Sequence, residues 1–125
     1  MITSRSARQA YHATKATTAS PRDVEAAILS SINADLRQAL DGKMKHPDLC
    51  VLLDKNAKIW RHFHSDLNST GNGLPIDLKQ RLLGLADMVF VETDRILRGG
   101  AGVGELIAIN DAIIAGLRPA MQEVA

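Results

Sequence analysis

Histidine and acidic side chains lie close together in residues 62–66, where they could bind a metal ion. His62 and Asp66 are four residues apart, and His64 lies between them. On a helix, groups four residues apart share one face, and two ligands at that spacing can hold zinc. A structural or catalytic zinc site needs at least a third ligand, and the spacing of the other residues does not identify one. We therefore expect surface histidines, with no metal site and no cofactor.

Catalytic groups show no recognisable pattern in the rest of the chain. The acidic residues are scattered over polar positions, without the pair in apolar surroundings that general acid–base catalysis would need. The single cysteine, Cys50, lies between Leu49 and Val51, which is typical of a small apolar residue rather than of a nucleophile. We therefore predict that the protein is not an enzyme.

Two asparagines, Asn56 and Asn110, interrupt apolar stripes and are candidate partner-binding residues. A buried asparagine is destabilising unless both ends of its amide form hydrogen bonds. One alternative is structural: each amide pairs across helices and fixes their register. The other is functional: one or both asparagines offer donors and acceptors to a bound chain. The sequence leaves both alternatives open.

Residues 48–68 form the most informative predicted helix, because they contain the only tryptophan, Trp60, and one of two phenylalanines, Phe63. The apolar residues of this helix form one stripe, which either packs in a core or lines a groove for an amphipathic partner helix. Trp60 and Phe63 are therefore also candidate partner-binding residues. The stripe has steps of three and four residues and comprises Leu49, Leu52, Leu53, Asn56, Ile59, Trp60, Phe63 and Leu67.

A helix over residues 20–40 is predicted by clear start and stop signals. Ser20 can cap the first amides, Pro21 suits the first helical position, and Asp23 favours the positive helix end. Asp41-Gly42 stops the helix. The residues expected on its inner face are Val24, Ala27, Ile28, Ile32, Leu36, Ala39 and Leu40.

Two further helices are predicted, over residues 75–98 and 103–117. The first has a wide apolar arc, typical of a helix that touches two neighbours. The second is expected to end at about Leu117, because Gly116 and Pro119 mark its end. No sustained alternation of polar and β-branched residues predicts a strand. The fold class is therefore all-α, an antiparallel bundle of four main helices with a short N-terminal helix alongside.

Residues 1–18 are predicted to form that short helix, which is too weak to be stable without docking. Tyr11 would anchor it and is the remaining candidate partner-binding residue. We expect a mobile arm unless this segment packs on the body or on a partner. The thin apolar stripe consists of Ala7, Ala10, Tyr11 and Thr14.

The length and charge are those of one ordinary domain spanning residues 1–125. Fifteen basic and fourteen acidic side chains give a net charge of +1, so no strong field attracts nucleic acid or membranes. No apolar stretch approaches the ~20 residues of a membrane span, and no secretory signal is visible. We therefore expect a cytoplasmic protein without membrane insertion.

The sequence resembles the FlaF family of alphaproteobacterial flagellar proteins over nearly the whole chain. The asparagine–tryptophan spacing, the Asn-x-Leu-Pro motif and the last Ile-Asn…Gly-Leu pattern are the most specific parts, and the glycine-rich connector at 99–104 is looser than the family pattern. The residues that carry the resemblance are Ala10-Tyr11, Ser20 to Glu25, Asn56 to Trp60, Asn72 to Pro75 with Leu78-Lys79, and Ile109-Asn110 through Ile113 to Gly116-Leu117.

The resemblance implies a flagellum biogenesis factor that binds flagellin as a cytoplasmic export chaperone or adaptor and so regulates flagellin production and secretion. It implies the amphipathic terminal helices of flagellin as the partner, with FlbT and the export apparatus as further candidates. The alternative is post-transcriptional control of flagellin mRNA, directly or with FlbT. Only the basic start of the chain supports it, namely Arg5, Arg8, Lys15 and Arg22 before the first acid. A structural part of the flagellum is a further alternative.

Overall fold

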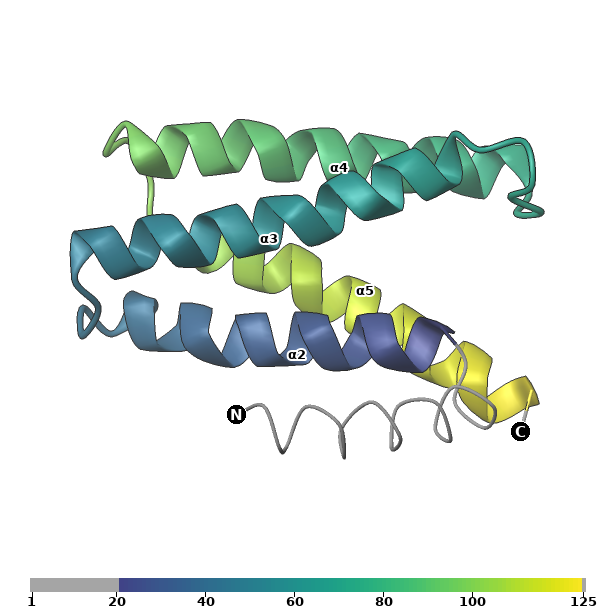
Figure 1. Ribbon diagram of the computed structural model, residues 1–125, viewed down its shortest axis with the longest axis horizontal. Coiled ribbons are helices and arrows are strands. Elements are labelled where there is room, and N and C mark those ends of the chain that lie inside the picture. Colours follow the sequence, from purple (N-terminus) through teal and green to yellow (C-terminus); the bar gives the residue numbers. More distant parts are fainter. Residues whose placement is uncertain (1–20, 125) are drawn as a thin grey trace, which may run out of the picture.

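A computed structural model describes residues 21–124 of the protein, with side chains described as far as Gly116. These residues form helices joined by loops, and no strand occurs among them, so the all-α prediction is confirmed. The predicted short helix in residues 1–18, with Tyr11, lies outside the described residues. The helices, labelled as in Figure 1, are α2 (Pro21–Leu40), α3 (His46–Leu67), α4 (Ile76–Leu97) and α5 (Gly104–Val124).

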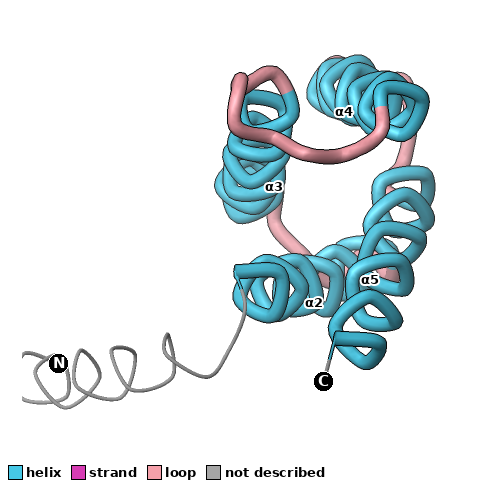
Figure 2. Tube along the Cα trace, turned by 90° about the vertical axis from the view of Figure 1, so that its right-hand side faces the viewer, coloured by secondary structure: helices cyan, strands magenta, loops and turns pink. Residues whose placement is uncertain are grey.

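The described helices form an antiparallel bundle in which successive helices run in opposite directions (Figure 1). Seen end-on, α2, α3, α4 and α5 occupy the corners of a four-sided arrangement in chain order (Figure 2). The most extensive packing joins α2 to α5 and α3 to α4, whereas α4 and α5 make fewer contacts. Figure 1 shows the reason: α5 begins beside α4 but crosses the bundle obliquely and ends beyond α2.

Glycines end α2 and α4 where the sequence predicted a stop. Gly42 has φ of 73° and Gly99 has φ of 80°, a left-handed conformation that favours glycine. Beyond each glycine, a backbone amide donates to a carbonyl of the last helical turn: Lys43 N to Gln38 O at 3.3 Å, and Gly100 N to Arg95 O at 2.8 Å. These bonds satisfy carbonyls that have no partner within the helix.

Helix α5 ends later in the chain than the sequence predicted. The helix was expected to end at about Leu117 but continues to Val124, through Gly116 and Pro119. A proline inside a helix removes one amide donor and crowds the preceding turn, but it does not remove the helical preference of the residues after it. The segment Ala120 to Glu123 consists of good helix formers, which explains how the helix can continue.

The buried face of α2 also differs from the prediction. Ile32 and Leu36 are buried as expected, but the exposed fractions of Val24 and Ile28 are 48% and 42%. Two apolar stripes on this helix share Ile32 and Leu36. The predicted stripe also contains Val24 and Ile28, whereas the stripe that packs in the core also contains Ala26 and Leu29. The buried residues of α2 are Ala26, Leu29, Ile32, Asn33 and Leu36.

This difference gives a first prediction. Leu29→Ala should lower the free energy of unfolding by about 2–5 kcal/mol, because a fully buried leucine leaves a cavity. Val24→Ala, in the same helix but half-exposed, should change it by less than ~0.5 kcal/mol. Urea denaturation of both variants checks this. Equal losses, or a larger loss for Val24→Ala, would mean that α2 presents the predicted face to the core.

The core lies between all four described helices, each of which contributes buried apolar residues. The predicted stripe of α3 is largely confirmed, since its members are buried or half-buried. Trp60 is the largest fully buried side chain, with 1% of its surface exposed. Other buried residues of the same core include Leu36, Leu53, Ala86, Val89, Leu106 and Ile109.

Candidate functional site

Trp60 forms a hydrogen bond inside the core with one of the two predicted asparagines. Its indole Nε1 donates to Oδ1 of Asn110 at 2.8 Å, joining α3 to α5. An indole N–H can only donate, so the bond requires the oxygen of the Asn110 amide to face Trp60. The Nδ2 group of Asn110 therefore points away from the indole and is available to two further acceptors.

Both acceptors are asparagine oxygens from other helices. Nδ2 of Asn110 donates to Oδ1 of Asn56 at 2.8 Å and to Oδ1 of Asn33 at 3.1 Å. Asn33 in turn donates from Nδ2 to the backbone oxygen of Ile107 at 3.1 Å and to Oδ1 of Asp111 at 2.9 Å. The asparagine cluster (Asn33, Asn56 and Asn110) thus joins α2, α3 and α5 in one continuous network.

The asparagine cluster is sealed from solvent, because none of its three side chains exposes more than 1% of its surface. Asn56 and Asn110 therefore form the contacts of the structural alternative, and Trp60 lies in the same core. One donor, Nδ2 of Asn56, is buried without a hydrogen-bond partner in the described structure. Asn33 was missed by the sequence analysis, although its spacing from Leu29 and Leu36 indicates the same helix face.

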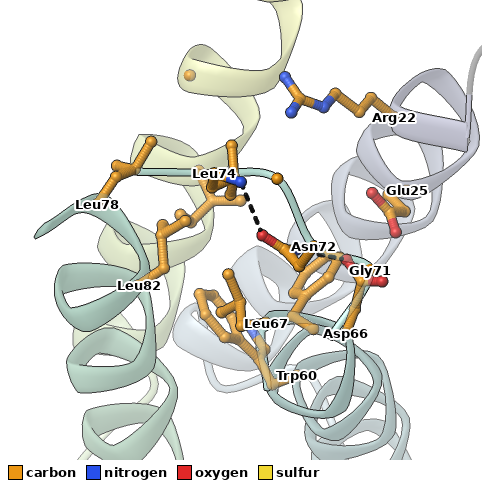
Figure 3. Close-up of a pocket in the computed structure, with 14 residues that line it drawn as sticks. Arg22, Glu25, Trp60, Asp66, Leu67, Gly71, Asn72, Leu74, Leu78 and Leu82 are labelled. Carbon is orange, nitrogen blue, oxygen red and sulfur yellow. Dashed lines mark hydrogen bonds between the residues drawn. The ribbon is translucent and has the colours of Figure 1, made fainter. Parts of the chain in front are cut away.

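An apolar cleft of about 590 Å³ opens at the end of the bundle where α2 begins and α3 ends (Figure 3). Leu78 and Leu82 of α4 face Trp60 and Leu67 of α3 across it. The other residues that line the cleft are Arg22, Glu25, Phe63, Asp66, Gly71, Asn72, Gly73, Leu74, Ile113 and Gly116.

The oblique course of α5 accounts for the position of this cleft. As α5 runs toward α2, it separates from the first turns of α4 (Figure 1). Ile113 and Gly116 of α5 therefore line the far side of the cleft rather than packing tightly on α4. Leu78 remains 40% exposed as a result.

The loop between α3 and α4 is held over the cleft by the side chain of Asn72. Its Oδ1 accepts a bond from the backbone amide of Leu74 at 3.1 Å, and its Nδ2 donates to Oδ2 of Asp66 at 3.3 Å. Nζ of Lys79 donates to the backbone oxygen of Asn72 at 2.7 Å. These contacts fix Leu74 at the edge of the cleft, as Figure 3 shows.

Phe63, like Trp60, is a predicted contact residue that lines this cleft. It is half-buried, and its ring packs edge-on against Trp60 with 5.4 Å between ring centroids. Leu78 and Leu82, which complete the apolar lining, were not among the predicted contact residues. The wide apolar arc of the predicted 75–98 helix is the feature of the sequence that could have identified these two leucines. The chemistry of the cleft is apolar burial, with charged side chains at one edge: Arg22, Glu25 and Asp66.

His62 and His64 of α3 point to neighbouring helices rather than to a shared site. Nε2 of His62 lies 3.2 Å from Oε2 of Glu25 on α2, and Nε2 of His64 lies 4.0 Å from Oδ1 of Asp87 on α4. Among the side chains that the structure describes, residues 21–116, no group of three or more histidine, cysteine, aspartate or glutamate residues could hold a metal ion.

No helix in the described part of the chain has the length and apolar character needed to span a membrane. The fold and the cleft together define a small all-helical protein with an apolar opening at one end of its bundle. The family model of the flagellar protein FlaF matches residues 7–117. The chain therefore belongs to the FlaF family, and the resemblance noted in its motifs is confirmed. The searches of curated proteins and of solved structures returned no match.

Proposed function

We propose that this FlaF-family protein binds flagellin in the cytoplasm as an export chaperone or adaptor, and so regulates flagellin production and secretion. The observation that carries the proposal is the apolar cleft at the end of the bundle, where Leu78 and Leu82 are incompletely covered. Membership in a flagellar family supports flagellin as the partner. The cleft lining offers binding surface rather than a catalytic arrangement, so we propose a binding protein and not an enzyme.

An amphipathic helix is the ligand that suits such a cleft. Apolar side chains spaced at three and four residues would enter it, while the polar face of the partner stays outside. The volume of about 590 Å³ lies within the ~300–1,000 Å³ typical of ligand pockets, so it takes a few anchor side chains rather than a whole helix. Arg22 and Asp66 at the edge would contact polar residues of the partner.

This mode of binding explains why a chaperone would be useful. The terminal segments of flagellin are amphipathic helices that assemble with one another when their apolar faces are exposed. A bundle that covers one such face would delay polymerisation and keep the subunit ready for export. Release would only require the partner helix to leave a cleft that is already open at one end.

A charge placed in the cleft tests the proposal. Leu78→Asp should weaken flagellin binding at least ~10-fold, about 1.4 kcal/mol, because it puts a carboxylate where an apolar side chain would dock. Calorimetry with purified flagellin measures the affinity. Val91→Asp is the matched control, because Val91 lies on the same helix, is 53% exposed and does not line the cleft.

The control variant should bind flagellin within ~2-fold of the unmodified protein, since its surface is outside the cleft. Unchanged affinity in a folded Leu78→Asp variant would reject the cleft as the flagellin site. If flagellin mRNA is retarded in gels at low salt and released steeply as salt rises, the RNA-binding alternative would be favoured instead.

A further inference from the structure

A second apolar groove, of about 720 Å³, runs along the outside of α2 and α3. It shares no lining residue with the cleft at the end of the bundle. We call it the α2–α3 groove. Its lining residues are Asp23, Val24, Ala27, Ile28, Ser31 and Ile32 from α2, with Lys55, Lys58 and Ile59 from α3.

The α2 side of this groove is formed by the exposed part of the predicted apolar stripe, whose member Ile32 also belongs to the core. Val24 and Ile28 are exposed by 48% and 42%, and Ala27 and Ser31 beside them are small. Leu29 and Leu36 already anchor α2 in the core, where both are fully buried, whereas Val24 and Ile28 leave much of their apolar surface open. Contiguous exposed apolar side chains mark interaction sites more often than ordinary surface.

The α3 side of the groove is basic. Lys55 and Lys58 line it, three residues apart and so one helical turn from each other. Asp54 lies 3.0 Å from Lys58 and 3.8 Å from Arg61, and all three side chains are more than half exposed. Such exposed ion pairs contribute little to stability, and the single carboxylate of Asp54 offsets the charge of only one cation, so the α3 side keeps a net positive charge. The single acid in the lining is Asp23, in the first turn of α2.

We propose that the α2–α3 groove docks an acidic amphipathic helix from a second protein partner. The apolar face of that helix would lie on Val24 and Ile28, and glutamates or aspartates along one edge would meet Lys55 and Lys58. The N-terminal residues of the chain itself do not fit this chemistry, because positions 1–22 contain basic but no acidic side chains. The groove and the cleft share no lining residue, so the partner helix would leave the side chains of the cleft uncovered.

Two synthetic helices of about 18 residues, five turns, test the proposal. Both carry the same leucine–alanine face, and their polar faces contain either glutamate or lysine. Fluorescence anisotropy with the full chain measures binding. We expect the glutamate peptide to bind at least ~10-fold tighter than the lysine peptide, with an affinity that falls as salt screens the charges. Equal binding of the two peptides, or none, would overturn the proposal.

Charge reversal locates the site. Lys55→Glu with Lys58→Glu should reverse the peptide preference, whereas Lys43→Glu with Lys45→Glu makes the same change in net charge outside the groove and should preserve it. An equal effect of the two double variants would show that net charge alone attracts the peptide, and would overturn the proposal.

Two further variants separate this groove from other surfaces. Ile28→Ser should weaken the glutamate peptide at least ~5-fold through lost apolar contact, and Leu78→Asp in the cleft should leave it unchanged. If Leu78→Asp no longer binds the glutamate peptide, the peptide binds in the cleft. That result would overturn the proposal for the α2–α3 groove and leave the flagellin proposal intact. If the unmodified protein forms a concentration-dependent dimer that Ile28→Ser abolishes, the groove binds a second copy of this chain and not another protein, which would overturn the proposal.

Discussion

Asn110→Leu is expected to lower the free energy of unfolding by about 3 kcal/mol or more. The substitution removes three hydrogen bonds together: the one accepted from Trp60 and those donated to Asn33 and Asn56. Each buried polar group left without a partner costs ~1–3 kcal/mol. Since a domain is stable by only ~5–15 kcal/mol, the variant should be close to unfolding at room temperature.

Urea denaturation followed by fluorescence of the single tryptophan measures this loss. Asn56→Leu is the matched control, because it removes only one accepted bond and also removes a donor, Nδ2, that has no partner. Its loss should be smaller than that of Asn110→Leu by at least ~1 kcal/mol. If the two variants are equally stable, Asn110 is not the centre of the network.

Trp60→Ala is expected to lower the free energy of unfolding by about 3–5 kcal/mol, the second large effect. The side chain is 1% exposed, packs against Phe63 and lies at the inner wall of the cleft, so its removal leaves a cavity. Because so large a loss threatens the fold itself, reduced flagellin binding by this variant would not identify Trp60 as a contact residue.

Trp60→Phe separates packing from hydrogen bonding. It keeps an aromatic ring but leaves Oδ1 of Asn110 without its indole donor, so a loss of about 1–3 kcal/mol is expected. Thermal unfolding by circular dichroism compares both variants, because neither retains a tryptophan for fluorescence. A loss as large in Trp60→Phe as in Trp60→Ala would mean that the hydrogen bond, and not the ring volume, dominates.

The helices could be predicted because their start and stop signals are local. Pro21 and Asp23 at the start of α2, and Gly42 and Gly99 just after α2 and α4, act through a few neighbouring backbone groups. The extension of α5 beyond Pro119 was not predicted, because a proline is only a probable helix stop.

The orientation of α2 could not be predicted in the same way. Val24 with Ile28, and Leu29 with Asn33, are both stripes of helical spacing on the same segment. The choice between them depends on a contact across more than seventy residues, in which the Asn110 amide of α5 donates to Asn33. A periodicity within one helix contains no information about that partner.

The cleft depends on tertiary geometry even more strongly. Phe63 was a predicted contact residue because it extends the stripe of α3, and it does line the cleft. Leu78 and Leu82 line it because α5 crosses away from the first turns of α4, and a crossing angle cannot be derived from hydrophobic spacing. Asn56 and Asn110, by contrast, lie in the core, where they hold helices together.

Methyl resonances of the full chain, followed by NMR during titration with a peptide from a flagellin terminal helix, test the central claim most directly. If the cleft holds that helix, the methyl groups of Leu78, Leu82 and Ile113 should shift together and saturate at one equivalent, while Val91 on the outer side of α4 should not move. Shifts centred on Val91, or no shifts at the three cleft residues at saturating peptide, would contradict the account.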